Sequence, residues 1–221
     1  MAAVRERIAA AASRAGRDPA SVRLVAVTKG VDADRINEAI AAGVDDVGEN
    51  RVQEAVRKHA AVNAGVRWHM VGHLQTNKAR RAAELFQVVH SVDSARVGEA
   101  LAAGRPHQLG PLEVLVEVDL TGIPGRSGAS PQTLTGVVSA VRALPGIRLT
   151  GLMTIAPQVD QPDAARPWFA QLRRLRDDLE QTLGAPIPEL SMGMSDDFEV
   201  AVEEGATVAR VGRAIFAPGM V

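Results

Sequence analysis

Leu24-Val25-Ala26-Val27-Thr28-Lys29 is an apolar run that ends in a lysine. Its aliphatic and β-branched residues predict a buried strand, with Lys29 at the point where the strand opens into a loop. Most lysines are solvated and have a pKa near ~10.4, and burial or cationic neighbours lower that value. A lysine with a lowered pKa offers the unprotonated amine that forms an imine with an aldehyde. Lys29 is therefore a candidate covalent binding residue, and a solvated strand-end lysine is the alternative.

The rest of the chain alternates between strand-like runs and helical patterns. Strand-like runs lie near 23–28, 45–48, 67–72, 87–92, 113–119, 148–153, 188–193 and 207–211. Helical patterns lie near 2–16, 32–42, 51–63, 76–84, 94–104, 131–144, 163–183 and 196–204. Strands separated by helices indicate parallel βαβ units. The sequence predicts a (β/α)8 TIM-type barrel that forms one domain over residues 1–221, with an N-terminal helix at about 2–16. No Gly-x-Gly-x-x-Gly follows the first strand, which disfavours a dinucleotide-binding sheet.

Composition excludes several classes of function. The net charge of −1 gives no overall attraction to nucleic acid or anionic lipid. The absence of cysteine excludes disulfides, thiolate nucleophiles and cysteine-ligated metals, and it suits a reducing cytoplasm. The longest apolar run near the N-terminus, 8–12, is too short for a signal-peptide core or a membrane span. We expect a cytoplasmic monomer that binds neither nucleic acid nor membrane.

In a barrel of this kind, functional residues gather where the strands end. Side chains alternate along a strand, so Val25, Val27 and Lys29 share one face. If that face is turned to the barrel axis, Lys29 lies at the upper rim of the barrel. The same alternation groups Arg210 and Gly212 on one face of the last strand.

Arg210 is a charged residue in an otherwise apolar strand, which is costly unless the charge is paired. Two interpretations stay open. The guanidinium forms a structural ion pair with an inward acid such as Glu117 or Asp119, or it contacts a ligand.

The last two strands end in glycine-bearing turns, Ser191-Met192-Gly193-Met194-Ser195 and Val211-Gly212-Arg213-Ala214. Barrels often bind phosphate at these two turns through backbone N–H groups. Tight turns without a ligand would have the same sequence. Together with Lys29, the turns predict a phosphate anchor across the barrel mouth from an amine.

His69 and His73 are the only pair of nearby histidines, and they fall on a predicted strand. Four residues of strand span roughly 13 Å, which is too far for two side chains to share one ion. We therefore predict no metal site.

Longer sequence motifs identify a family. They are Leu24–Lys29, Gly48-Glu49-Asn50-Arg51-Val52-Gln53-Glu54, Trp68–Lys78, His90–Ser94, Gly151–Pro157 and the run Leu190–Phe216. In this order the motifs resemble the pyridoxal phosphate homeostasis protein family, over nearly the whole chain. The resemblance implies a barrel like the N-terminal domain of alanine racemase. It also implies that pyridoxal 5′-phosphate (PLP) is held as a Schiff base on Lys29.

The resemblance also implies cofactor contacts at specific positions. Ser191, the backbone of Met192, Gly212 and Arg213 would surround the phosphate, Arg210 would face the pyridine nitrogen, and Asn50 and Met153 would line the ring. The chain departs from the family at Gly30, where many relatives have threonine, and at Arg51, where tyrosine is frequent. Arg213 stands where a threonine usually binds phosphate, so only its backbone N–H is expected to serve.

The residues themselves bear on what bound PLP does. PLP enzymes draw charge into a protonated pyridine ring, and an arginine at the ring nitrogen disfavours that protonation. Racemases with such an arginine use a lysine and a tyrosine as paired bases, and this chain has no tyrosine. We therefore predict a carrier or buffer of PLP without catalytic residues, with apo PLP-dependent enzymes as recipients. The alternatives are an amino-acid racemase or other PLP enzyme, and a barrel aldolase that forms its imine with a sugar phosphate.

Overall fold

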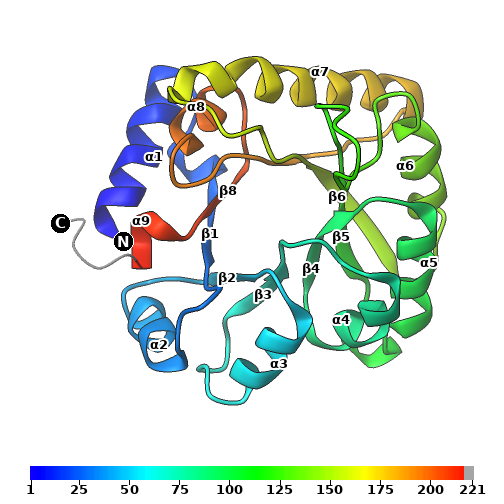
Figure 1. Cartoon of the computed structure of the whole chain (residues 1–221), viewed down its shortest axis with the longest axis horizontal. Coiled ribbons are helices and arrows are strands. Elements are labelled where there is room, and N and C mark those ends of the chain that lie inside the picture. The colour runs from blue at the N-terminus through cyan, green and yellow to red at the C-terminus, as the bar shows by residue number, and fades with distance from the viewer. Residues whose placement is uncertain (217–221) are drawn as a thin grey trace.

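The computed structural model describes residues 1–216. Eight parallel strands follow one another in chain order and close into a barrel, with β8 pairing back to β1 (Figure 1). The strands are β1 (Arg23–Val27), β2 (Asp46–Glu49), β3 (Arg67–Met70), β4 (Val88–Val92), β5 (Leu112–Glu117), β6 (Ile147–Met153), β7 (Glu189–Ser191) and β8 (Val208–Val211). The predicted (β/α)8 barrel is confirmed.

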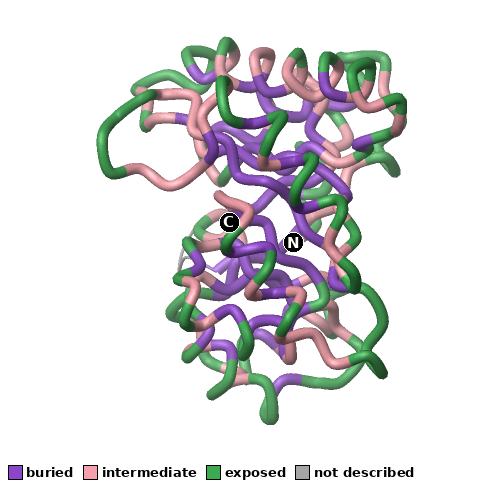
Figure 2. The backbone as a smooth tube through the Cα atoms, turned by 90° about the vertical axis from the view of Figure 1, so that its right-hand side faces the viewer, coloured by how far each residue is buried: buried purple, intermediate pink, exposed green. Residues whose placement is uncertain are grey.

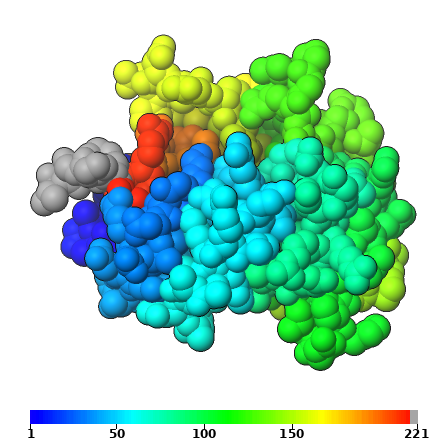
Figure 3. All heavy atoms as spheres, turned by 60° about the horizontal axis from the view of Figure 1, so that its bottom comes forward, coloured from blue at the N-terminus to red at the C-terminus, as the bar shows by residue number. Residues whose placement is uncertain are grey.

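Helices form the layer outside the barrel. They are α1 (Ala2–Arg14), α2 (Ala33–Ala41), α3 (Val52–His59), α4 (Ala79–Leu85), α5 (Ala95–Gly104), α6 (Leu134–Arg142), α7 (Arg166–Leu183), α8 (Phe198–Glu203) and α9 (Arg213–Phe216). In Figure 2 buried backbone runs through the interior, and exposed backbone forms the outer turns. Figure 3 shows the segments of the chain that contain α2, α3 and α4, coloured from blue through cyan to teal, next to one another on one face of the molecule. None of the helices within residues 1–216 has the length and apolar character needed to cross a membrane.

Helix ends follow the local sequence signals. The Asp32 carboxylate accepts the backbone N–H of Arg35 at 2.9 Å and begins α2, and the Ser94 hydroxyl accepts the N–H of Val97 to begin α5. Gly184 ends α7 in the left-handed conformation, with φ of 60°. Thr76 begins a 3-10 turn, so α4 starts later than its sequence pattern predicted.

The two faces of the strands have different environments, as alternation predicts. Val25, Val27 and Val208 pack with Val71 in a small cluster inside the barrel. Ala26, the residue between the two valines of β1, packs in the helix-facing core instead. Arg210 has the same parity as Val208 and therefore lies on the inward face of β8.

Ion pairs occupy the amino-terminal end of the barrel. Arg23 at the start of β1 pairs with Glu189 at the start of β7 at 3.0 Å. Glu113 of β5 pairs with both Arg67 of β3 and Arg148 of β6. These ion pairs occupy the end of the barrel where the strands begin. A ligand-binding site is therefore expected at the opposite end, where the strands finish.

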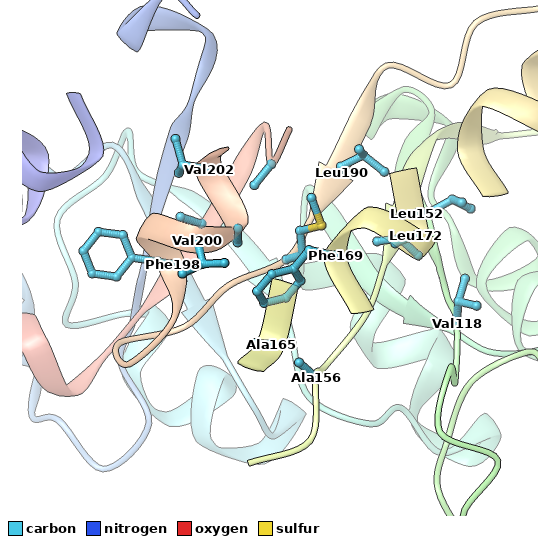
Figure 4. Packing of buried hydrophobic residues seen from close by; sticks show 14 of the residues in the cluster. Val118, Leu152, Ala156, Ala165, Phe169, Leu172, Leu190, Phe198, Val200 and Val202 are labelled. Atoms are coloured by element: carbon cyan, nitrogen blue, oxygen red, sulfur yellow. The ribbon is translucent and has the colours of Figure 1, made fainter. Parts of the chain in front are cut away.

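The largest apolar cluster lies between the barrel and α1, α6, α7 and α8. Phe169 of α7 is fully buried in it (Figure 4), and Phe198 at the start of α8 is in the same cluster. Because α8 follows β7 directly, this packing fixes the helix behind one of the turns at the barrel mouth.

Phe169→Ala removes a fully buried ring from this cluster. Such a change should lower the free energy of unfolding by about 3–5 kcal/mol, because apolar contacts are lost and a cavity is left. Urea denaturation measures the difference. Leu109→Ala is the control, since that side chain is 47% exposed and its loss should change stability by less than about 0.5 kcal/mol. Equal effects of the two variants would contradict this account of the core.

Candidate functional site

The ends of β1 and β8 lie side by side at the barrel mouth. The register that pairs Ala26 with Val211 brings Val27 next to Gly212. A Cβ atom on Gly212 would lie 3.1 Å from the carbonyl oxygen of Val27, so the two backbones are in close contact. Lys29, two residues beyond Val27, is therefore a neighbour of the turn that follows β8.

Lys29 lies in a tight turn rather than on the strand. β1 ends at Val27, and the Val31 N–H donates to the carbonyl of Thr28 at 3.0 Å to close the turn. Gly30 has a φ of 70°, which favours glycine at this position of the turn. The Lys29 side chain is exposed, so its amine is accessible to molecules in solvent.

Contacts from α3 hold the turn in place. The Lys58 ammonium of α3 donates to the Thr28 carbonyl and to the Glu49 carboxylate, at 2.7 Å each. Glu54 accepts the Gly30 N–H at 2.7 Å and pairs with Lys58 at 2.6 Å. Burial raises the pKa of the Glu49 carboxyl, and the hydrogen bonds from Lys58 and Thr28 offset only part of that effect. The backbone on both sides of Lys29 is thus fixed while its side chain is free.

Arg210 lies inside the barrel with only 4% of its surface exposed. Its guanidinium donates to the Ser191 hydroxyl at 2.6 Å and to the Thr154 carbonyl at 2.9 Å. Within residues 1–216 it forms no ion pair, so neither Glu117 nor Asp119 is the structural partner that one interpretation required. Burial lowers the pKa of Arg210 to about 10, against the opposing influence of Glu117 and Asp197. Arg210 is therefore a buried cation at neutral pH.

A chain of buried hydrogen bonds extends from Arg210 across the barrel. Ser191 Oγ lies 2.8 Å from His90 Nδ1, His90 Nε2 lies 2.8 Å from His69 Nδ1, and His69 Nε2 lies 2.8 Å from Asp46 Oδ1. Burial lowers the pKa of both histidines, so both are neutral near pH 7. Arginine only donates and a carboxylate only accepts, so every hydrogen in this chain points from Arg210 toward Asp46.

Asp46 is ionised, as this direction requires. Its burial would raise the pKa of the carboxyl, but the hydrogen bond from His69 and the charges of Arg23 and Arg67 outweigh burial, and the pKa is lowered. His73, by contrast, lies on the surface with its Nδ1 at 2.8 Å from Ser127 Oγ. His69 and His73 thus contact different groups.

The turn after β7 differs from its predicted role. The Met192 N–H donates to the Val208 carbonyl at 3.1 Å, and the Met192 side chain is fully buried. The Ser191 hydroxyl is committed to His90 and Arg210 inside the barrel. The Met192 N–H and the Ser191 hydroxyl therefore already have hydrogen-bond partners within the protein.

Ser195 is the hydroxyl that lies at the mouth. Its Oγ accepts the Ala214 N–H at 3.3 Å, which links the turn after β7 to the turn after β8. The N–H groups of Gly212 and Arg213 make no hydrogen bond within the described part of the chain. The Arg213 side chain pairs with Asp196 instead of turning inward. Strand alternation could not have found Ser195, because residues 191 and 195 have the same parity and β7 ends at Ser191.

The remaining predicted residues lie on other sides of the mouth. Met153 is fully buried inside the barrel beside Val88 and Leu115. Asn50 follows β2 and lines a cavity of about 390 Å³ together with Arg51 and Lys78. The structure therefore brings Arg210, Met153, Gly212 and Ser195 to one end of one barrel.

Comparisons with known proteins agree with this architecture. The family of the alanine racemase N-terminal domain matches residues 1–218. The pyridoxal phosphate homeostasis protein of Pseudomonas aeruginosa is 45% identical over 217 residues, which is 98% of this chain and 93% of that protein. The homologue in Escherichia coli, of the same name, is 41% identical over 224 residues, which is 98% of this chain and 94% of that protein.

Solved structures extend the comparison. PipY of Synechococcus elongatus with PLP bound has a TM-score of 0.83 and 37% identity, with 97% of this chain and 100% of that chain covered. Alanine racemase of Corynebacterium glutamicum has a TM-score of 0.68 at 23% identity, with 98% of this chain and 61% of that chain covered, and it shares the fold. Close identity over almost the full length of the first relatives, on the barrel described above, shows that the chain belongs to the pyridoxal phosphate homeostasis protein family.

Proposed function

We propose that this chain binds PLP covalently and reversibly as a Schiff base on Lys29 and acts as a carrier or buffer of PLP in intracellular PLP homeostasis. The observation that carries the proposal is the position of an exposed lysine on a fixed turn next to the N–H groups of Gly212 and Arg213, which have no hydrogen-bond partner among residues 1–216. PLP supplies an aldehyde that reacts with an amine and a phosphate that needs such donors. The PLP-bound structure of PipY, a relative of 37% identity, supports PLP as the ligand.

The phosphate would be held by the two joined turns. Gly212 offers its N–H and no side chain, and it lies against Val27 where a larger residue would collide. The Arg213 N–H and the Ser195 hydroxyl complete the set of donors. We propose Ser195 for the role first assigned to Ser191, because the Ser191 hydroxyl already serves His90 and Arg210. Met192 contributes packing rather than a donor.

The ring would lie between Met153 and Asn50, with Arg210 facing the pyridine nitrogen. The guanidinium stays charged at neutral pH, with a pKa of about 10, so it disfavours a proton on that nitrogen. An unprotonated ring stores carbanion charge poorly. The arrangement therefore suits binding and release better than turnover, with apo PLP-dependent enzymes as the recipients we propose.

Lys29→Ala should abolish the visible absorption band of the PLP-bound protein and the PLP mass retained after borohydride reduction. Only the amine forms the covalent bond, so weak non-covalent binding through the phosphate turns should survive. Spectroscopy and intact-protein mass spectrometry measure both effects. Lys78→Ala is the matched control and should keep the band, since Lys78 lines the neighbouring cavity. Borohydride labelling of Lys58 or Lys78 in the wild type would refute the assignment.

Pyridoxal, which lacks the phosphate, should bind much more weakly than PLP. Charge-assisted hydrogen bonds contribute roughly 1.5–3 kcal/mol each, so the loss of two weakens binding by about a hundredfold or more. Ser195→Ala should weaken PLP binding by about tenfold or more and leave pyridoxal binding unchanged. Equilibrium titration gives the four dissociation constants. Ser13→Ala, on the exposed side of α1, is the control, and equal losses for both aldehydes in Ser195→Ala would place the phosphate elsewhere.

An amino-acid racemase is the second candidate, favoured by the barrel shared with alanine racemase. The chain has no tyrosine to act as a second base. General acid–base groups contribute about 10²–10⁴ in rate, so only trace exchange of the α-proton is expected. Deuterium incorporation from solvent into L-alanine and L-serine measures this exchange, alongside PLP release to an apo-enzyme. Sustained turnover that Lys29→Ala abolishes would make the protein an enzyme.

A further inference from the structure

Glu117 ends β5 and faces the interior of the barrel at the level of the mouth. Strand alternation places it on the same face as Leu115, which packs inside the barrel with Met153 and Val88. The register of β5 and β6 pairs Glu117 directly with Met153. Glu117 therefore lies beside the residue proposed to line the ring.

Glu117 is buried, and one oxygen of its carboxyl group has no hydrogen-bond partner within residues 1–216. The residue is 7% exposed, and its Oε2 atom is fully buried without a hydrogen bond. Within residues 1–216 it also forms no ion pair. Buried polar groups are almost always hydrogen-bonded, because burying an unpaired carboxylate is costly. Glu49, the other acid with an unpartnered buried oxygen, differs because its second oxygen contacts Thr28 and Lys58.

Four charged groups act on Glu117 from the surrounding elements. Arg210 of β8 and Arg126 in the loop after β5 favour the ionised form, while Asp93 after β4 and Asp119 after β5 oppose it. Burial is the largest influence, and it raises the pKa of Glu117 to about 7. A substantial fraction of Glu117 is therefore protonated at neutral pH, and a protonated carboxyl has one O–H donor.

We propose that Glu117 is a further ligand-binding residue of the barrel mouth and that it acts in its protonated form, donating a hydrogen bond from its carboxyl to an acceptor atom on the ring of the bound cofactor. This inference rests on the proposed PLP site. PLP carries a phosphate and a ring oxygen that are negative at neutral pH, so its entry beside an ionised carboxylate would be opposed. Protonation of Glu117 removes that repulsion. The buried carboxyl oxygen then gains a hydrogen-bond partner on the ligand.

The proposal fixes the sign of a pH effect. Below pH 7 the carboxyl already holds its proton, so binding needs none from solvent. Above pH 7 the free protein is ionised, so binding takes up a proton and becomes weaker as the pH rises. If the pKa of Glu117 is well above 7 in the PLP-bound protein, the affinity for PLP falls by up to about tenfold for each pH unit above 7.

The test compares the wild type with Glu117→Gln, whose amide is a neutral donor of similar shape. The PLP dissociation constants of the two proteins should be similar at pH 6. At pH 8.5 Glu117→Gln should bind about tenfold or more tightly than the wild type. Glu99→Gln is the control, because it removes an exposed acid of α5 that is not among the groups acting on Glu117, and its pH profile should parallel that of the wild type. Calorimetry in two buffers of different ionisation enthalpy should show proton uptake at pH 8.5 that Glu117→Gln lacks.

Two measurements without PLP test the protonation state alone. Carboxyl ¹³C NMR of the free protein should show one glutamate that titrates near pH 7 and disappears in Glu117→Gln. Burial raises the pKa of Glu117 in the folded protein, so the ionised carboxylate is less stable there than in the unfolded chain. The wild type should therefore lose stability relative to Glu117→Gln as the pH rises through 7. Titration of Glu117 near its ordinary value, or parallel PLP profiles for the two proteins, would overturn the inference. Failure of both proteins to bind PLP at any pH would instead overturn the site itself.

Discussion

The structure of the barrel mouth depends on the burial of one positive charge. Arg210 lies inside an apolar barrel without an ion pair in the described residues, and its guanidinium is held only by the Ser191 hydroxyl and the Thr154 carbonyl. Two neutral acceptors are modest compensation for a desolvated cation. The hydrogen-bonded histidines add to it, because they connect the cation through Ser191 and His90 to the ionised Asp46 at the start of β2, two strands from β8. These hydrogen bonds fix the position of the guanidinium, which is protonated at neutral pH because its pKa is about 10.

Lys29 differs from Arg210, because its backbone is held in place and its side chain is exposed. Lys58 and Glu54 anchor the backbone on either side of Lys29 through hydrogen bonds of 2.7 Å each. The Lys29 side chain itself is exposed to solvent. A catalyst benefits from a desolvated amine at a fixed position, whereas a carrier needs an amine that solvent and acceptors can reach. In the PLP site that we propose, Arg210 would orient the ligand and Lys29 would bind and release it, so orientation and release would depend on different residues.

The alternation of strand residues carried most of the information in the sequence. It grouped Val25 and Val27 on one face of a strand, and in the structure that face is turned to the interior of the barrel. It could not assign Ser191 and Ser195, because both are serines of one short motif and only the contacts of β7 with β4 and β8 separate them. The pairing of His90 with Ser191 joins residues 101 positions apart, and no local pattern encodes that distance. Glu117 was correctly predicted to face inward, but its distance from Arg210 depends on how the strands are staggered around the barrel.

The comparison with alanine racemase shows how far the fold determines function. At 23% identity the two chains share the barrel, and the racemase extends well beyond it, since the match covers 61% of its chain. A barrel alone provides a mouth, an amine and phosphate-binding turns, but proton transfer at a substrate carbon needs bases placed on both of its faces. The titratable groups at the mouth of this barrel include the exposed Lys29 and the buried Glu117, and burial raises the pKa of Glu117 to about 7. Glu117 lies at the level of Met153, on the inward face of β5. In the carrier role that we propose, this carboxyl group would hold the ligand by a hydrogen bond rather than transfer a proton at a substrate carbon.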